Sequence, residues 1–337
     1  MEPYIEIAGR RIGKGYPAYI VAEMGINHNG DINLALELIG AASEVGVDAV
    51  KVQIVNADRS YTKDSVSYKI FKNAEFIEEQ WERIAEQGKA SGIDVFATFT
   101  TSSELWQSEE LGLPCVKISS SNITNFPLLE AITKLGKPVI MSTGMGYLGE
   151  VDKAIRFLEK NGQQQISLLQ CTSLYPTRAQ DVNLRAMRTL GLAFPKYPIG
   201  FSDHTLGIHC AIAAVALGAR IIEKHFTLDR SMEGPDHHFS SDPTELKCLL
   251  EAIREVELAL GSSAREPVEE EIILRDKFQR SLVASLDIEA GDLLKLDNIS
   301  AKRSGRPGIA PEYFDIVTAR VAKKRIPKGT PITWDLI

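Results

Sequence analysis

The sequence predicts an α/β fold, a (β/α)8 barrel of the TIM type, followed by a small β-rich domain. Short β-branched apolar runs alternate with amphipathic helical stretches from residue 19 onward. Eight such units within one region of about 250 residues are typical of this barrel. The runs are almost continuously apolar, as buried parallel strands are. No Gly-x-Gly-x-x-Gly motif follows the first run, which disfavours an open dinucleotide-binding sheet.

The elements follow in order along the chain. Residues 4–18 hold two short runs around Gly9 and are expected to form a hairpin ahead of the barrel. Between the barrel strands, stretches such as 34–39 and 211–217 carry the apolar spacing of helices. The eight strands are expected at 19–22, 49–53, 95–98, 115–118, 139–142, 166–170, 199–202 and 220–224.

The barrel domain is expected to span residues 1–265, because the periodicity is lost after Leu260. An acidic, helical linker is expected over 266–280. Short β-type runs, interrupted by turn signals such as Pro327-Lys328-Gly329, indicate a β-rich domain over 281–337.

Composition narrows the class of protein. The net charge is -7 and no basic block is present, which disfavours nucleic acid or an anionic membrane as the main partner. The first residues do not resemble a signal peptide, and no apolar run approaches the roughly 20 residues of a membrane span. The four cysteines lack metal or redox spacing, so we expect reduced thiols in a cytoplasmic protein.

Every expected strand ends on polar or charged residues, and in such a barrel the chemistry lies at these strand ends. Residues two apart on a strand point to the same side, as in Glu223 and His225. A buried lysine without a partner is costly, so the set indicates a site rather than packing. Its members are Glu23, Lys51, Gln53, Thr98, Lys117, Ser142, Thr172, Ser173, Ser202, His204, Glu223 and His225.

The histidines His204 and His225 end the last two expected strands, and an acidic residue precedes each of them by one or two positions. Adjacent parallel strands would bring both imidazoles within reach of one cation. Two imidazoles leave coordination positions open, which is typical of a Lewis-acid site rather than a structural one. For single residues other interpretations remain: Lys51 in a structural ion pair, and Thr98 and Ser142 as helix caps.

The two lysines, with the hydroxyls of Thr98, Ser142 and Ser202, form a set suited to a phosphate and a carboxylate. A divalent cation beside them would polarise an aldehyde. This combination suggests that the protein forms a carbon–carbon bond from phosphoenolpyruvate.

The chain resembles the sialic acid (N-acetylneuraminate) synthase family, whose members join phosphoenolpyruvate to an N-acylated mannosamine-type sugar. In the tail, residues 280–282, 288–292 and 302–303 resemble the antifreeze-like (SAF) domain of these synthases. The barrel motifs that carry the resemblance are 22–30 (AEMGINHNG), 51–53 (KVQ), 142–145 (STGM), 171–176 (CTSLYP), 200–205 (GFSDHT), 223–227 (EKHFT) and 234–237 (GPDH).

The resemblance implies a role for each site residue. His204 and His225 would hold the cation, usually manganese, with magnesium or cobalt as alternatives. Glu23, Tyr175 and Asp236 would face the sugar, and Arg303 would reach it from the partner protomer, because the family's dimers are domain-swapped. The residues around phosphoenolpyruvate would be Lys51, Gln53, Thr98, Lys117, Ser120, Ser142, Ser173 and Ser202.

By the same resemblance the protein is a transferase that yields a nine-carbon 2-keto acid, and it releases phosphate by C–O cleavage after water adds. Glu23 or Glu223 would be the acid/base. Both are expected among cations that favour ionisation, so the sequence assigns neither.

Three departures from the family pattern lie on the sugar side. Asn122 replaces a glutamate, Ser173 replaces an asparagine, and the longer stretch 302–308 lets Arg306 compete with Arg303. The acceptor therefore stays open between N-acetylmannosamine and a diacetamido-trideoxyhexose, the substrate of a legionaminic or pseudaminic acid synthase.

Two alternatives belong to other classes. A Schiff-base aldolase would use Lys51 or Lys117 as its nucleophile. A non-catalytic carbohydrate-binding protein would use the tail domain, but it would leave the polar strand ends of the barrel unexplained.

Overall fold

The computed structural model describes residues 3–337, and of residue 276 only the backbone. The chain divides into two compact units, Met1–Gly261 and Ser262–Ile337. None of the helices in the described residues is both long enough and apolar enough to cross a membrane.

The first unit is the predicted barrel. Eight parallel strands close on themselves, because the last strand pairs in parallel with the first. Several strands differ from the expected bounds by a few residues, and the first extends to Gly25. The strands are β3 (Tyr19–Gly25), β4 (Ala49–Ile54), β5 (Asp94–Phe99), β6 (Val116–Ile118), β7 (Val139–Ser142), β8 (Ile166–Cys171), β9 (Ile199–Asp203) and β10 (Ile221–His225).

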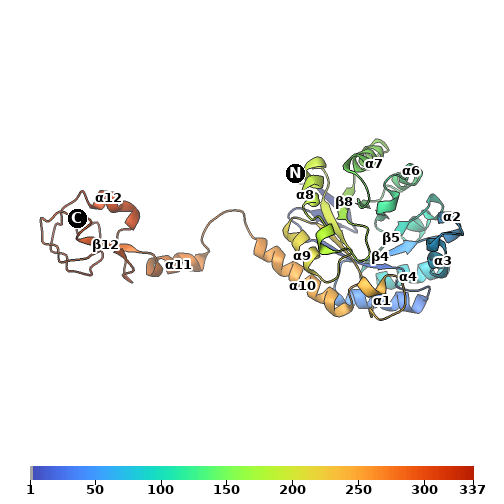
Figure 1. Cartoon of the computed structure of the whole chain (residues 1–337), viewed down its shortest axis with the longest axis horizontal. Helices are drawn as coiled ribbons and strands as arrows, with labels where there is room; N and C mark the ends of the chain where they lie inside the picture. Colours follow the sequence, from blue (N-terminus) through green and yellow to red (C-terminus); the bar gives the residue numbers. More distant parts are fainter. Residues whose placement is uncertain (1–2) are drawn as a thin grey trace. The chain divides into compact units, whose positions relative to one another are not determined.

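Helices surround the strands (Figure 1). Their ends follow local chemistry: Asp31 caps the first helix by accepting from the Asn33 amide, and Gly46 ends it in the left-handed region, at φ 89°. The main helices are α1 (Ile32–Val45), α4 (Glu78–Ser91), α6 (Phe126–Thr133), α7 (Leu148–Lys160), α8 (Ala186–Ala193), α9 (His209–Ala216) and α10 (Pro243–Leu260). The other α-helices of this unit are α2 (Ala57–Ser60), α3 (Val66–Asn73) and α5 (Gln107–Glu110).

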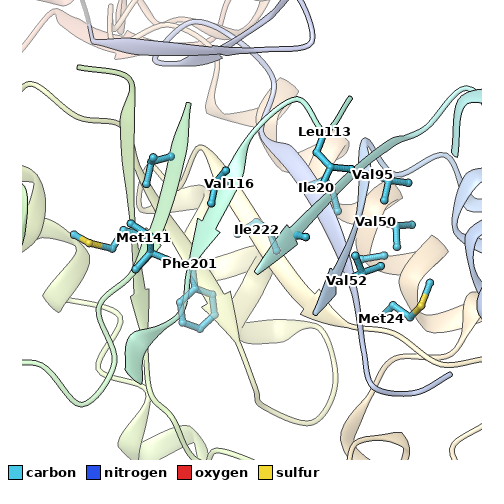
Figure 2. Close-up of a cluster of buried hydrophobic side chains, with 14 of the residues drawn as sticks. Ile20, Met24, Val50, Val52, Val95, Leu113, Val116, Met141, Phe201 and Ile222 are labelled. Carbon is cyan, nitrogen blue, oxygen red and sulfur yellow. The ribbon is translucent and has the colours of Figure 1, made fainter. Parts of the chain in front are cut away.

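The larger core lies between the strands and this layer of helices. Side chains of neighbouring strands, including Ile20, Val50 and Met141, form one buried cluster (Figure 2). Helix residues such as Leu38 and Leu129 complete it. Each side chain of this size stabilises the fold by about 1.5–3 kcal/mol when fully buried.

The barrel interior has an apolar half and a polar half. A hairpin of β1 (Tyr4–Ile7) and β2 (Arg10–Gly13), the one predicted, places Ile5 and Ile12 in a cluster with Phe96 and Ile140 inside the barrel. Because side chains alternate along a strand, the next inward positions toward the carboxyl ends carry the polar residues. The apolar half is therefore filled, and the polar half lines a cavity.

The second unit has a small core of its own, which includes Leu282, Ile288 and Ile326. It matches the predicted β-rich tail domain, although much of it pairs through isolated bridges rather than long strands. The antiparallel pair β11 (Ser281–Ala284) and β12 (Ile299–Lys302) follows helix α11 (Glu269–Phe278) and precedes α12 (Phe314–Val317).

Candidate active site

A cavity of about 400 Å³ opens at the carboxyl ends of the barrel strands. Its lining includes every site residue predicted from the sequence except Thr172 and Arg303. They are Glu23, Lys51, Gln53, Thr98, Lys117, Ser120, Ser142, Ser173, Tyr175, Ser202, His204, Glu223, His225 and Asp236.

Two lysines and two glutamates form the floor of this cavity. Lys51 Nζ lies 2.7 Å from Glu23 Oε2 and 3.9 Å from Glu223 Oε2, and Lys117 Nζ lies 3.4 Å from Glu223 Oε1. All four side chains are buried. Each lysine is paired with a glutamate, because a buried charge needs a counter-charge.

Hydroxyl and amide groups connect this floor to the neighbouring strands. Lys51 Nζ donates to Thr98 Oγ1 at 3.2 Å, and Lys117 Nζ donates to Ser142 Oγ at 2.7 Å. Ser202 donates to Glu223 at 2.8 Å. Both Thr98 and Ser142 thus use their hydroxyls to accept from lysines and hold the ammonium groups in place.

The same surroundings give the two glutamates opposite proton affinities. Burial alone would raise the pKa of Glu223, but Lys117 and Lys51 outweigh it and hold that pKa at about 2. For Glu23, burial outweighs Lys51, and the charge of Glu223 adds to it, so its pKa is raised. The sequence predicted that cations favour ionisation of both carboxyls; burial reverses this for Glu23.

The two histidines lie with their rings 5.4 Å apart, and both line the cavity. His204 Nδ1 is 2.9 Å from the Thr172 carbonyl oxygen, so Nδ1 carries the proton and Nε2 keeps a free lone pair. His225 Nδ1 is buried without a hydrogen-bond partner in the described structure, and lies 3.7 Å from Asp236 Oδ2.

An unshared nitrogen on each of two neighbouring imidazoles fits a divalent cation. The described residues hold no group of three or more His, Cys, Asp or Glu placed to bind a metal. A cation here would therefore have His204 and His225 as protein ligands, with water and substrate oxygens at the remaining positions.

Gly25 makes the close approach of three site residues possible. It has a φ of 55°, and a Cβ placed on it would lie 3.2 Å from Asp236 Oδ2, 3.4 Å from Glu23 Oε1 and 3.5 Å from His225 Cε1. A side chain would be both strained and crowded there. Burial, with Glu23 nearby, raises the pKa of Asp236 to about 6.

On the opposite wall, Ser120 and Ser173 approach the chain after β7. Ser120 Oγ accepts from the Gly144 amide at 3.0 Å. Cys171 Sγ lies 3.7 Å from Ser120 Oγ and 3.9 Å from His204 Nδ1. The sequence interpretation treated Cys171 only as a reduced thiol; its position directly after the predicted strand 166–170 was the signal that could have placed it in the site.

An apolar wall of the cavity was also missed. Tyr61, Ile70 and Phe71 line it from the segment between β4 and α4, together with Ile26 and Pro235. The signal was the length of this connection, because long connections in compact domains are often functional.

Of the residues expected on the sugar side, some line the cavity and others do not. The Tyr175 ring lies 4.2 Å from the His204 ring and is half exposed. The Asn122 side chain donates a hydrogen bond to Ser119 and accepts one from Asn125, and it does not line the cavity. Arg303 belongs to the second unit, where its guanidinium lies 5.3 Å from the centre of the Phe278 ring.

Comparisons with known proteins find matches for both the barrel and the tail domain. The NeuB family model matches residues 38–265, and the SAF domain model matches 279–337. An N,N'-diacetyllegionaminic acid synthase of Legionella pneumophila is 39% identical over 96% of this chain and 96% of its own. An N-acetylneuraminate-9-phosphate synthase of Mus musculus is 36% identical over 93% of this chain and 91% of its own.

Among solved structures, the N-acetylneuraminic acid (sialic acid) synthetase of Leptospira borgpetersenii, in complex with citrate, matches with a TM-score of 0.77. It is 36% identical, and the match covers 82% of this chain and 98% of that one. The match therefore extends to nearly the whole of that synthetase.

Proposed function

The chain belongs to the NeuB family, and from this membership we propose that it condenses phosphoenolpyruvate with an N-acylated amino sugar. Its relatives include sialic, legionaminic and pseudaminic acid synthases, so the chain is an enzyme of this group. The observation that carries the proposal is one cavity that joins two buried lysines to two imidazoles with unshared nitrogens.

The lysine side of the cavity suits phosphoenolpyruvate. Lys51 and Lys117 offer ammonium groups, and Ser142, Ser120 and Ser173 offer hydroxyls for phosphate and carboxylate oxygens. Because each lysine is already paired with a glutamate, the phosphate and carboxylate of the substrate would share the ammonium groups with Glu23 and Glu223.

His204 and His225 would hold the divalent cation, for which manganese is our first choice. When bound, such a cation supplies Lewis acidity toward a carbonyl oxygen. The chain itself orients one of the two imidazoles: the Thr172 carbonyl accepts from His204 and fixes its tautomer.

Carbon 3 of phosphoenolpyruvate would attack the aldehyde carbon of the open-chain sugar, forming the new bond as its double bond opens. Water then adds to carbon 2, and the bond from carbon 2 to the bridging oxygen breaks. Phosphate leaves with that oxygen, and carbon 2 becomes a ketone. The six sugar carbons and three from phosphoenolpyruvate give a nine-carbon 2-keto acid.

Glu23 is our candidate for proton transfer. Its raised pKa lets it hold a proton, which it would give to the developing sugar hydroxyl and regain from the attacking water. Glu223 stays ionised and balances the lysines. This division of roles uses opposite environments for two neighbouring carboxyls.

For the acceptor we propose an unphosphorylated sugar. The only lysines among the described residues that line the cavity are Lys51 and Lys117, both at the floor, and no arginine lines it. Within the lining that one protomer supplies, a sugar 6-phosphate would find no further ammonium or guanidinium group; the partner subunit's Arg303 would be the one cation added across the dimer. Tyr61, Ile70 and Phe71 favour apolar substituents, as in a diacetamido-trideoxyhexose.

The test is phosphate release from phosphoenolpyruvate with manganese and each of three acceptors: N-acetylmannosamine, its 6-phosphate, and a diacetamido-trideoxyhexose. We expect the trideoxy sugar to give the highest kcat/KM, the 6-phosphate the lowest, and a chelator to abolish release. Absence of release with all three contradicts the proposed reaction. A preference for the 6-phosphate contradicts only the proposal that the acceptor is unphosphorylated.

A Schiff-base aldolase is the second candidate, because burial lowers the pKa of Lys117 and would aid its nucleophilicity. Borohydride trapping of a carbonyl substrate on Lys117 would support it. Loss of activity with a chelator but not with borohydride would remove it.

A further inference from the structure

Lys224 and Asp203 form an ion pair that the proposed reaction does not use. Asp203 directly precedes His204, Lys224 directly precedes His225, and the two are register partners on β9 and β10. Because side chains alternate along a strand, the histidines point into the cavity while the ion pair points to the outer face of the sheet. Neither Asp203 nor Lys224 lines the cavity.

The pair is fully buried. Lys224 Nζ lies 3.0 Å from Asp203 Oδ2, and their side chains are 1% and 0% exposed. Removing two charges from water is costly, and apolar residues of similar volume often serve stability equally well. Stability alone therefore gives little reason for an ion pair at this position.

The geometry of the pair offers another reason. Asp203 Oδ1 accepts from the Thr205 amide at 2.9 Å, and Lys224 Nζ donates to the Thr205 carbonyl. The carbonyl of His204 in turn accepts from the Thr177 amide at 2.8 Å. The His204 carbonyl and both the amide and the carbonyl of Thr205 are thus hydrogen-bonded.

The same ammonium group belongs to the strand of the second histidine. Lys224 is flanked by Glu223 and His225, and the His225 carbonyl accepts from the Ser241 amide at 2.8 Å. One buried ion pair thereby joins the backbone segments that carry both imidazoles.

We propose that the Lys224–Asp203 pair is a positioning device that fixes the spacing of His204 and His225, and so sets the affinity of the cavity for a divalent cation. It does this without contact with cation or substrate. The inference rests on the cation site of the proposed function, and it assigns the two residues no catalytic step.

The test compares Mn²⁺ dissociation constants of the full-length chain, stripped of metal with a chelator and titrated while free Mn²⁺ is followed by electron paramagnetic resonance. Lys224→Met alone would leave Asp203 buried without a counter-charge. The main variant is therefore Asp203→Asn/Lys224→Met, which removes both charges and keeps an acceptor for the Thr205 amide.

Lys137→Met is the matched control. Lys137 also donates to two backbone carbonyls, those of Ser108 and Leu113, but it precedes β7 at the opposite end of the barrel. Its removal should lower the melting temperature and leave the Mn²⁺ affinity unchanged.

For the double variant we expect a folded protein by circular dichroism, with a Mn²⁺ dissociation constant raised about tenfold or more, as for other residues that orient metal ligands. At saturating Mn²⁺ its KM for phosphoenolpyruvate should equal that of the wild type, because the lysine side of the cavity is intact. A folded double variant with wild-type Mn²⁺ affinity overturns the inference. A wild-type chain that binds no Mn²⁺ contradicts the cation site itself, and the inference with it.

Discussion

At the scale of single residues, Glu23 and Glu223 show how placement decides chemistry. Both are buried beside the same lysine, at 2.7 and 3.9 Å from Lys51 Nζ. Glu223 has a second lysine at 3.4 Å and a serine donor, and its pKa falls to about 2. Glu23 lacks that second cation, so burial raises its pKa.

Glu23→Gln should therefore lower kcat by about 10²- to 10⁴-fold, because an amide cannot transfer the proton. The Mn²⁺ affinity should stay near that of the wild type. Steady-state phosphate release checks the prediction, with Glu104→Gln as the control: Glu104 is a buried carboxyl outside the cavity lining. A Glu23→Gln enzyme with wild-type kcat would rule Glu23 out as the acid/base.

At the scale of elements, the turn after β7 depends on Gly144. A Cβ at this position would lie 2.5 Å from Ser173 Oγ and 2.8 Å from Ser120 Oγ. Gly144→Ala should displace both hydroxyls and break the bond from the Gly144 amide to Ser120. We expect the KM for phosphoenolpyruvate to rise about tenfold, the equivalent of one lost hydrogen bond.

Gly149→Ala is the control for that substitution. Gly149 lies in α7, where a Cβ would have no neighbouring atom within 4 Å, and alanine is the better helix former. Its KM should not change. An equal rise of KM in both variants, or in neither, would contradict the role given to the turn.

The turn between β3 and α1 carries the clearest pH dependence of stability. Burial lowers the pKa of His28 to about 4, and its ring stacks 4.3 Å from that of Phe76. Between pH 6.5 and 4 the unfolded chain binds the proton and the folded chain does not, so the free energy of unfolding falls as pH falls. The loss should reach about 3 kcal/mol at pH 4.

Urea unfolding across this pH window, for the wild type and His28→Gln, measures the effect. The substitution should flatten the dependence, whereas His209→Gln, which removes an exposed histidine, should not. Identical slopes in wild type and His28→Gln would show that His28 is not the titrating group.

At the scale of the whole molecule, the domain-swapped dimer that the family resemblance implies predicts complementation between variants. Arg303→Ala should raise the KM of the acceptor about ten- to hundredfold, the range for a lost hydrogen bond to a charged group. Arg306→Ala should change it less. Mixed with Glu23→Gln, Arg303→Ala should regain activity, because one cavity of the mixed dimer then has both residues.

Reassociation under mild denaturant, followed by a phosphate assay, checks this prediction. If the mixture is no more active than its components, Arg303 does not act across protomers. If Arg306→Ala has the larger effect, the assignment between the two arginines is reversed.

The sequence predicted the barrel well because its strands are separate apolar runs with polar ends, and the same pattern located the cavity lining. It did not predict the pairing of Lys117 with Glu223, since those residues are brought together only when β10 closes the barrel. Lys224 was missed because its partner, Asp203, lies on another strand. The apolar wall of Tyr61 and Phe71 was missed because two short helices carry no long periodic pattern.

The proposed reaction is a condensation that breaks the C–O bond of phosphoenolpyruvate. The most direct test uses phosphoenolpyruvate labelled with ¹⁸O at the bridging oxygen, together with manganese and the preferred acceptor. We predict that mass spectrometry finds the label in the released phosphate and none of it in the nine-carbon 2-keto acid. Label in the keto acid, or no acceptor-dependent phosphate release, would contradict this reaction.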